Sequence, residues 1–365
     1  MRILILTANT GGGHNSTALA LAEQFLKMKI DYEITDALSL ISEKVSEFIS
    51  WGHSYVYRKL PRLFGSAYRF EERHPPKQIS DYFAKGAVSL QEKLLSECFD
   101  GVICVHVFAG MMMAEVRKRF QNSIPYYFVA TDYTCSPGVG ALNADGFFIP
   151  HRMLFGEFIR GAISADRLYA TGIPVRSEFC NDPPKREARR LLGLREEGRL
   201  VLLSCGSMGC GKLERHALEL ANALPRDVAL VVLCGNNQAL VEDLSRFQSD
   251  TFAAVGFTSE IPLYMSAADV YLTKPGGLMT TEAISKRLPM VFVDAVPGCE
   301  SRNFDFLTKC GVAEGSKNWR QAISKVNWLL AHPEDLEAQR LQMESFLSGN
   351  PVEQICRCVC NRVSS

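Results

Sequence analysis

Short, continuous runs of apolar residues alternate with longer amphipathic stretches along most of the chain. In the first half these runs lie at 2–7, 101–106, 126–131 and 146–149, and residues 34–36 (ITD) form a further candidate strand. In the second half they lie at 200–205, 228–234, 252–256, 270–273 and 290–294. Runs that are apolar throughout are typical of strands in a parallel sheet that is buried on both faces. Helical patterns such as 16–29, 212–223 and 259–268 separate them, so the sequence predicts two series of βαβ units.

A turn-rich stretch at 172–184 lies between the two series and marks a domain boundary. The sequence therefore predicts an α/β protein with two Rossmann-like lobes, whose parallel sheets face each other across a cleft. We assign residues 1–175 to the N-terminal lobe, 176–345 to the C-terminal lobe and 346–365 to a tail helix. In such sheets, ligands bind at the carboxyl ends of the strands.

One insertion, at 40–95, interrupts this rhythm and contains no convincing strand. Aromatic and basic residues are interleaved in it, and between 51 and 80 six Lys/Arg and two Glu give a net charge of +4. The pattern fits two core helices with solvated basic edges. It also fits a helix that lies on an anionic membrane surface. The residues that would contact such a surface or an acceptor are Trp51, Arg58, Arg62, Phe64 and Arg69.

The composition is that of an ordinary soluble globular protein, with 47% hydrophobic and 22% charged residues. Its 40 Lys+Arg balance 40 Asp+Glu, so net charge gives no case for nucleic acid binding. No apolar run approaches the ~18 residues that span a bilayer, and the first run is too short for a signal peptide. We therefore expect a cytoplasmic protein with reduced cysteines. Cys356, Cys358 and Cys360 lack the spacing of metal ligands and are expected on an ordinary C-terminal helix.

The loop after the first strand carries three glycines, at 11–13, which are followed by His14. Such glycines let the backbone pass close to a ligand, and the next helix directs its N-terminus at it. The motif is not GxGxxG, so a nicotinamide cofactor finds little support. His14 is a candidate general base, although a His here also fits a helix cap. Asp132, at the end of another strand, is a second candidate base, a group that orients His14, or a turn cap.

Two glycine-rich loops of the second half are candidates for holding phosphates. The loop at 204–211, which includes Ser207, lacks the Lys-Ser/Thr ending of a Walker A loop, which argues against ATP binding of that kind. The turn at 274–277 (KPGG) stands between a strand and a helix. Its N–H groups and the dipole of the helix would seat a diphosphate without a metal ion. We expect these donors to be the N–H groups of Gly276, Gly277 and Leu278.

Polar side chains near this turn suit the hydroxyl groups of a sugar nucleotide. Glu282, within the first two turns of the helix, is close enough to accept hydrogen bonds from vicinal hydroxyls. Glu300 and Asn303 offer a carboxylate and an amide three residues apart, after the next strand. Each feature alone is common, and the order of the features along the chain makes the set specific.

The ordered set resembles glycosyltransferase family 28, and within it the monogalactosyldiacylglycerol synthases and bacterial processive diacylglycerol glucosyltransferases. The resemblance rests on GGGH ending at His14, TD at 131–132, GIPVR at 172–176, CGxN at 234–237, GF at 256–257, KPGG at 274–277, TEA at 281–283 and PGxExxN at 297–303. It implies a GT-B fold, a UDP-sugar bound by the C-terminal lobe and a diacylglycerol-type acceptor against the N-terminal lobe. It also strengthens the membrane interpretation of the basic segment.

The resemblance implies roles for individual residues as well. His14 matches the glycine-loop histidine that is proposed to act at the acceptor. Cys299 stands where relatives often have Gln, so the hexose stays open between glucose and galactose. The donor-binding residues expected on this basis are Gly13, Ser207, Phe257, Gly276, Gly277, Leu278, Thr281, Glu282, Glu300 and Asn303.

The reaction implied is transfer with inversion, in which one base acts on the face opposite the leaving UDP. A metal site would usually show paired carboxylates, and the sequence contains no Asp-x-Asp. We therefore expect a metal-independent enzyme without a cofactor, with the UDP-sugar as its donor substrate, bound peripherally on the inner face of the cell membrane. A UDP-sugar epimerase, a peptidoglycan-type UDP-N-acetylglucosamine transferase and a non-catalytic UDP-sugar sensor stay open as alternatives.

Overall fold

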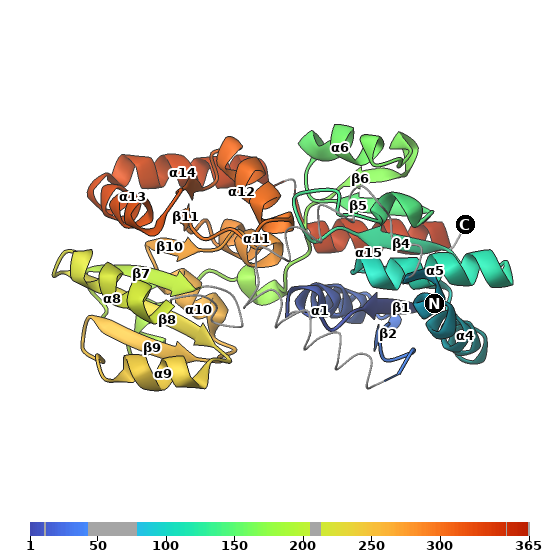
Figure 1. The fold of residues 1–365 in the computed structure, drawn as a ribbon, viewed down its shortest axis with the longest axis horizontal. Coiled ribbons are helices and arrows are strands. Elements are labelled where there is room, and N and C mark those ends of the chain that lie inside the picture. The colour runs from blue at the N-terminus through green and yellow to red at the C-terminus, as the bar shows by residue number, and fades with distance from the viewer. Residues whose placement is uncertain (11, 43–78, 205–212, 348, 364–365) are drawn as a thin grey trace. The chain divides into compact units, whose positions relative to one another are not determined.

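The computed structural model describes residues 1–10, 12–42, 79–204, 213–347 and 349–363 (Figure 1). The chain divides into two compact units. Unit 1 consists of Met1–Ser177, Val296–Arg302 and Ser348–Ser365, and unit 2 of Glu178–Ala295 and Asn303–Leu347. Of the helices that the structure describes, none has both the length and the hydropathy needed to cross a membrane.

Unit 1 is built on a six-stranded parallel sheet (Figure 1). Its strands are β1 (Arg2–Thr7), β2 (Asp31–Asp36), β3 (Gly101–Cys104), β4 (Tyr126–Val129), β5 (Gly146–Ile149) and β6 (Leu168–Ala170). Its helices are α1 (Gly12–Lys27), α4 (Ile79–Glu97), α5 (Val107–Phe120), α6 (Phe155–Arg160) and α15 (Pro351–Val363). The strand order β2-β1-β3-β4-β5-β6 changes direction between β1 and β3. The loops after these two strands therefore meet at the switch point, where sheets of this kind bind ligands.

The C-terminal helix α15 belongs to the core of unit 1. Ile355, Cys356 and Val359 are fully buried, in a cluster that includes Phe25 of α1. The Cys356 thiol lies 3.8 Å from the carbonyl oxygen of Leu21, also in α1, and burial raises the pKa of this thiol. The cysteines of the tail thus pack as small apolar side chains, on the ordinary helix that the sequence predicted.

Unit 2 repeats the architecture with a second six-stranded parallel sheet. Its strands are β7 (Arg199–Ser204), β8 (Val228–Gly235), β9 (Phe252–Gly256), β10 (Val270–Thr273), β11 (Met290–Phe292) and β12 (Glu314–Gly315). The helices from here to the tail are α7 (Lys185–Leu191), α8 (Leu213–Ala223), α9 (Gln238–Ser245), α10 (Ile261–Ala267), α11 (Gly277–Ser285), α12 (Cys299–Lys309), α13 (Trp319–Ala331) and α14 (Pro333–Phe346). The order β12-β11-β10-β7-β8-β9 places the switch point between β10 and β7.

The predicted α/β class, with two Rossmann-type parallel sheets, is confirmed. The continuous apolar runs correspond to strands that are buried along their whole length, since every residue of β3, β4, β5 and β10 is buried. Strands β6 and β12 were not predicted, since they have only three and two residues and make no recognisable run. Helix α1 begins at Gly12, earlier than the predicted start at Ser16.

Candidate active site

His14 lies in the first turn of α1, at the switch point of the unit 1 sheet. Its Nδ1 is 2.9 Å from the carbonyl oxygen of Val105, the residue that follows β3. A carbonyl oxygen only accepts hydrogen bonds, so Nδ1 carries the ring proton and donates it. The hydroxyl of Thr131, after β4, lies 3.1 Å from the same nitrogen. The other ring nitrogen, Nε2, therefore keeps its lone pair, as a general base requires.

Burial is the main influence on the protonation of His14, and it lowers the pKa of the imidazole below its usual value. The negative charge of Asp132 and the hydrogen bond to Val105 act in the opposite direction and are weaker. His14 is thus neutral at neutral pH, in the form that accepts a proton. The structure brings the two candidate bases close together, with Asp132 acting on His14 through its charge.

His106, to which the sequence analysis assigned no role, packs directly against His14. The two rings meet edge to face, with their centroids 4.4 Å apart and an interplanar angle of 77°. His106 caps α5 by accepting the N–H of Phe108 at Nδ1, and its Nε2 lies 3.1 Å from the hydroxyl oxygen of Thr10. Because Nδ1 accepts, Nε2 carries the proton and donates it to Thr10. Both nitrogens of His106 are engaged, so this ring positions His14 and is not itself the base.

We expect Asp132→Asn to shift the acidic limb of the pH profile to lower pH. The charge of Asp132 raises the pKa of His14, so its removal lets burial lower that pKa further. A base with a lower pKa stays deprotonated under more acidic conditions, so kcat/KM would begin to fall at a lower pH than in the wild type. The measurement is kcat/KM, across the acidic and neutral range, for the sugar transfer that the sequence resemblance implies. Loss of transfer at every pH in a folded variant would instead make Asp132 the base.

The turn at 274–277 follows β10 and lies at the switch point of the unit 2 sheet. Gly276 is the N-cap of α11 and donates its own N–H to the carbonyl oxygen of Lys274 at 2.9 Å. The N–H of Gly276 is thus engaged inside the turn, and its expected contact with a diphosphate stays a prediction. The next donors, the N–H groups of Gly277 and Leu278, belong to the first turn of α11 and have no partner within the helix. Among the described residues, a Cβ at Gly276 would meet no atom within 4 Å.

Three predicted donor-binding side chains lie in or behind this turn. The hydroxyl of Thr281 donates to the carbonyl oxygen of Gly277 at 2.7 Å, one helical turn earlier. Glu282 is only 7% exposed. Asn303 is fully buried, and its amide nitrogen donates to the carbonyl oxygen of Pro275 at 3.0 Å. The amide nitrogen of Asn303 thus supports the turn, and the expected contact of Asn303 with the sugar stays a prediction.

The remaining predicted residues are more widely distributed. Glu300 lies in the first turn of α12, where its carboxylate accepts the N–H of Val296 at 2.8 Å. Phe257 directly follows β9 at the carboxyl end of the unit 2 sheet and is 75% exposed. Gly13 precedes His14 in α1. The predicted residues outside the described part of the chain are Ser207, Trp51, Arg58, Arg62, Phe64 and Arg69. Within the described part, no three His, Cys, Asp or Glu side chains gather as metal ligands would.

Two family models match the sequence. Residues 14–175 match monogalactosyldiacylglycerol (MGDG) synthase, and residues 200–297 match the glycosyltransferase family 28 C-terminal domain. His14 and Asp132 lie within the first match, and the turn at 274–277 lies within the second. The two matches thus follow the two sheets.

Individual relatives agree with these matches. The chain is 26% identical to the processive diacylglycerol beta-glucosyltransferase of Bacillus pumilus (strain SAFR-032) over 352 residues, which cover 94% of this chain and 91% of the relative. Among solved structures, MurG of Acinetobacter baumannii has a TM-score of 0.63 at 15% identity and covers 99% of both chains. A UDP-GlcNAc 2-epimerase from Neisseria meningitidis, bound to UDP-GlcNAc, has a TM-score of 0.64 at 14% identity and covers 99% of this chain and 100% of its own. At such identities the two structures show the fold alone, which is the GT-B fold.

Proposed function

We propose that the chain is a glycosyltransferase of family 28 that transfers a hexose from UDP-glucose or UDP-galactose to a diacylglycerol-type lipid. Two findings support this acceptor. The curated relative is named a diacylglycerol glucosyltransferase, and unit 1 matches MGDG synthase. In this proposal the UDP-sugar binds to unit 2 and the lipid binds to unit 1, at the inner face of the cell membrane.

The hydrogen bond between Nδ1 of His14 and the carbonyl oxygen of Val105 is the observation that carries the proposed reaction. The acceptor hydroxyl must lose a proton as its oxygen attacks the anomeric carbon, and Nε2 of His14 has the lone pair to take it. The hydrogen bond to Val105 fixes the ring while this proton moves. As the new C–O bond forms, the bond from the anomeric carbon to the UDP oxygen breaks on the opposite face, so the reaction inverts the configuration.

Negative charge develops on the leaving UDP at the N-terminus of α11. The unpaired N–H groups of the first turn and the positive end of the helix dipole stabilise this negative charge. The helix dipole acts over the first helical turn of α11 only. The turn at 274–277, which Asn303 supports, would place a diphosphate at this end of the helix. Such electrostatic stabilisation needs no metal ion, which is why the proposed mechanism is metal-independent.

One assay separates the proposal from its alternatives. The protein is incubated with UDP-glucose, UDP-galactose and UDP-N-acetylglucosamine, each with vesicles that contain diacylglycerol, and the products are identified by mass. A hexosyl-diacylglycerol is the expected product. An epimerised nucleotide sugar in the absence of lipid would favour the epimerase, whose solved example shares the fold. Binding without any product would favour a sensor, and transfer of only N-acetylglucosamine would favour the peptidoglycan-type reaction.

Membrane attachment gives a separate prediction, which rests on the sequence of the basic segment. Changing Arg58, Lys59, Arg62 and Arg69 together to Ser should weaken co-sedimentation with anionic vesicles. Each cation near an anionic surface contributes about 1 kcal/mol, and the attraction decays within a Debye length of ~10 Å. Wild-type binding should therefore weaken at high salt, down to the part that the aromatic residues supply.

The matched control changes four exposed arginines elsewhere, whose surface ion pairs contribute little to stability. These are Arg186, Arg215, Arg246 and Arg357. The control should sediment like the wild type, since it loses the same charge from other surfaces. Equal sedimentation of all three proteins with neutral and anionic vesicles would favour the other interpretation of the segment, a pair of core helices.

A further inference from the structure

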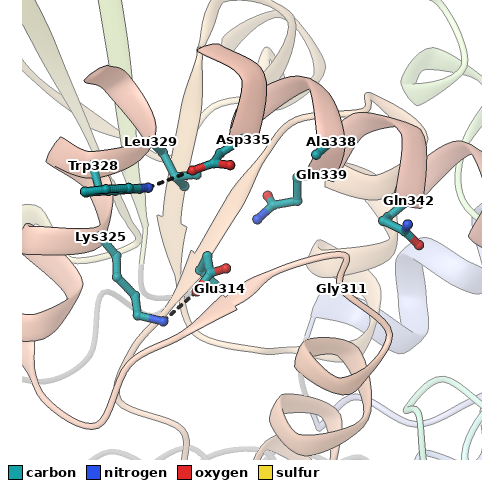
Figure 2. A pocket seen from close by; sticks show the side chains of 9 residues that line it. All are labelled: Gly311, Glu314, Lys325, Trp328, Leu329, Asp335, Ala338, Gln339 and Gln342. Atoms are coloured by element: carbon teal, nitrogen blue, oxygen red, sulfur yellow. Dashed lines mark hydrogen bonds and ion pairs between the residues drawn. The ribbon is translucent and has the colours of Figure 1, made fainter. Parts of the chain in front are cut away.

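Unit 2 contains a concave site apart from the turn at 274–277. A cavity of about 450 Å³ lies between α13, α14 and the edge strand β12 (Figure 2). Its volume is in the range of small-molecule sites, roughly 300–1,000 Å³. Gly311 precedes β12 and Trp328 lies near the C-terminal end of α13, so the cavity lies toward the amino ends of the strands. The turn at 274–277 lies at their carboxyl ends, and both family matches end before the cavity's first residue.

A buried amide points into this cavity. Gln339 is 6% exposed, and its side-chain oxygen accepts the backbone N–H of Met290 at 2.6 Å. Because an amide NH2 group cannot accept a hydrogen bond, the atom that faces the N–H of Met290 is the amide oxygen, and the NH2 group faces the other way. Figure 2 shows this nitrogen directed at the middle of the cavity. It has no hydrogen-bond partner among the described residues.

Two polar pairs face this amide, and each leaves a carboxylate oxygen available. Lys325 Nζ lies 2.5 Å from one oxygen of Glu314, and the indole N–H of Trp328 donates to one oxygen of Asp335 at 2.7 Å. Figure 2 shows Trp328 and Asp335 on one side of the cavity and the Lys325–Glu314 pair on the other. The lining thus alternates donors and acceptors within one small volume. A hydroxyl group is both a donor and an acceptor, so it can bind between neighbours of either kind.

Trp328 adds an aromatic surface to these polar groups. His332 stacks on one face of the indole, with the ring centroids 3.7 Å apart, and yet Trp328 is 56% exposed. One imidazole covers only one face, so the other face of the indole is open. Its N–H is fixed by Asp335, which holds the ring in place without ligand. A rigid, open indole beside alternating donors and acceptors suits a ring that is apolar on one face and hydroxylated at its edge.

We infer that this cavity binds a hexopyranose, at a site separate from the donor and acceptor sites of the transfer reaction. The apolar face of the sugar packs on Trp328, and its hydroxyl groups bind Gln339, Asp335 and the Lys325–Glu314 pair. A quaternary ammonium ion fits less well, because Lys325 already neutralises Glu314 and Trp328 is the single indole in the lining. The sugar can come from a glycolipid headgroup or from a soluble saccharide, which share this chemistry.

The test follows the indole N–H signals of the full-length protein by NMR during titration with methyl β-D-glucopyranoside, once without UDP and once with saturating UDP. The Trp328 signal, assigned with Trp328→Phe, should shift in a saturable manner. Trp328→Ala should raise the dissociation constant by about tenfold or more, through loss of the stacking surface. Phe247→Ala, which removes a comparably exposed aromatic ring (48%) from the same unit, should leave it unchanged.

Three results would overturn the inference: no shift, a shift that UDP abolishes, or a shift with tetramethylammonium but not with the glucoside. A further arm distinguishes the source of the sugar. If neutral vesicles that contain glucosyl-diacylglycerol retain the wild type and release Trp328→Ala, the ligand is a lipid headgroup. If both proteins sediment equally while the soluble glucoside binds, the ligand is a soluble saccharide.

Discussion

His14→Ala should lower the rate of sugar transfer by ~10²-fold or more, the usual contribution of a general base. The lone pair of Nε2, which in the proposed mechanism takes the proton of the acceptor, is lost with the ring. His106 cannot replace it, because its nitrogens are engaged with Phe108 and Thr10. UDP affinity should stay within about twofold, since the residue belongs to unit 1 and acts on the acceptor.

His151→Ala is the matched control for this substitution. His151 also belongs to unit 1 and also accepts a backbone N–H at Nδ1, from Met153. Its loss should leave transfer near the wild-type rate. Steady-state rates with a saturating UDP-sugar and thermal unfolding curves are measured for both variants. A His14→Ala protein that unfolds normally and transfers sugar at the wild-type rate would remove His14 from the mechanism.

The strands of both sheets could be predicted because their sequence pattern has one physical cause. Residues 102–104 and 126–129 are buried on both faces, so each position of the run must be apolar. Where burial is incomplete, the pattern fails. Strand β12 has two residues, both half-buried, and is held in the sheet by its pairing with β11. Nothing in a two-residue segment distinguishes it from a turn.

The start of α1 shows why local propensity was insufficient. Three glycines favour a loop, since glycine is a poor helix former. The helix nevertheless begins at Gly12, and the imidazole of His14 bonds to the carbonyl of Val105, 91 residues further along the chain. That partner follows β3, which lies beside β1 only because of the strand order. A contact so remote in sequence leaves no local signal.

The same limit applies to the atoms of the site. The positions of His14, Asp132 and the turn at 274–277 were predictable, because each follows a strand and parallel strands end at one edge. The use of each polar atom was not predictable. The N–H of Gly276 and the amide of Asn303 both form hydrogen bonds that build the turn. The second of these bonds joins residues that are 28 positions apart in the sequence, so no local pattern predicts it.

Glu282→Ala should weaken UDP binding by roughly 1–3 kcal/mol, about 5- to 150-fold, if the carboxylate accepts the ribose hydroxyls. Glu282 lies in the second turn of α11, behind the N–H groups that would hold the diphosphate, and is 7% exposed. A bound ribose would therefore meet a carboxylate that is already largely desolvated. Hydrogen bonds to a charged group are stronger in such surroundings than in water.

Calorimetry with UDP alone measures this effect without depending on the acceptor. Glu242→Ala is the matched control, because Glu242 lies in the second turn of α9, which also follows a strand of the unit 2 sheet. Its removal should leave UDP affinity unchanged. Glu282→Gln keeps the shape of the buried side chain and one acceptor oxygen, so it should bind UDP between the wild type and Glu282→Ala. A folded Glu282→Ala protein with wild-type affinity would place the ribose elsewhere, since ribose hydroxyls that lost a carboxylate acceptor would bind more weakly.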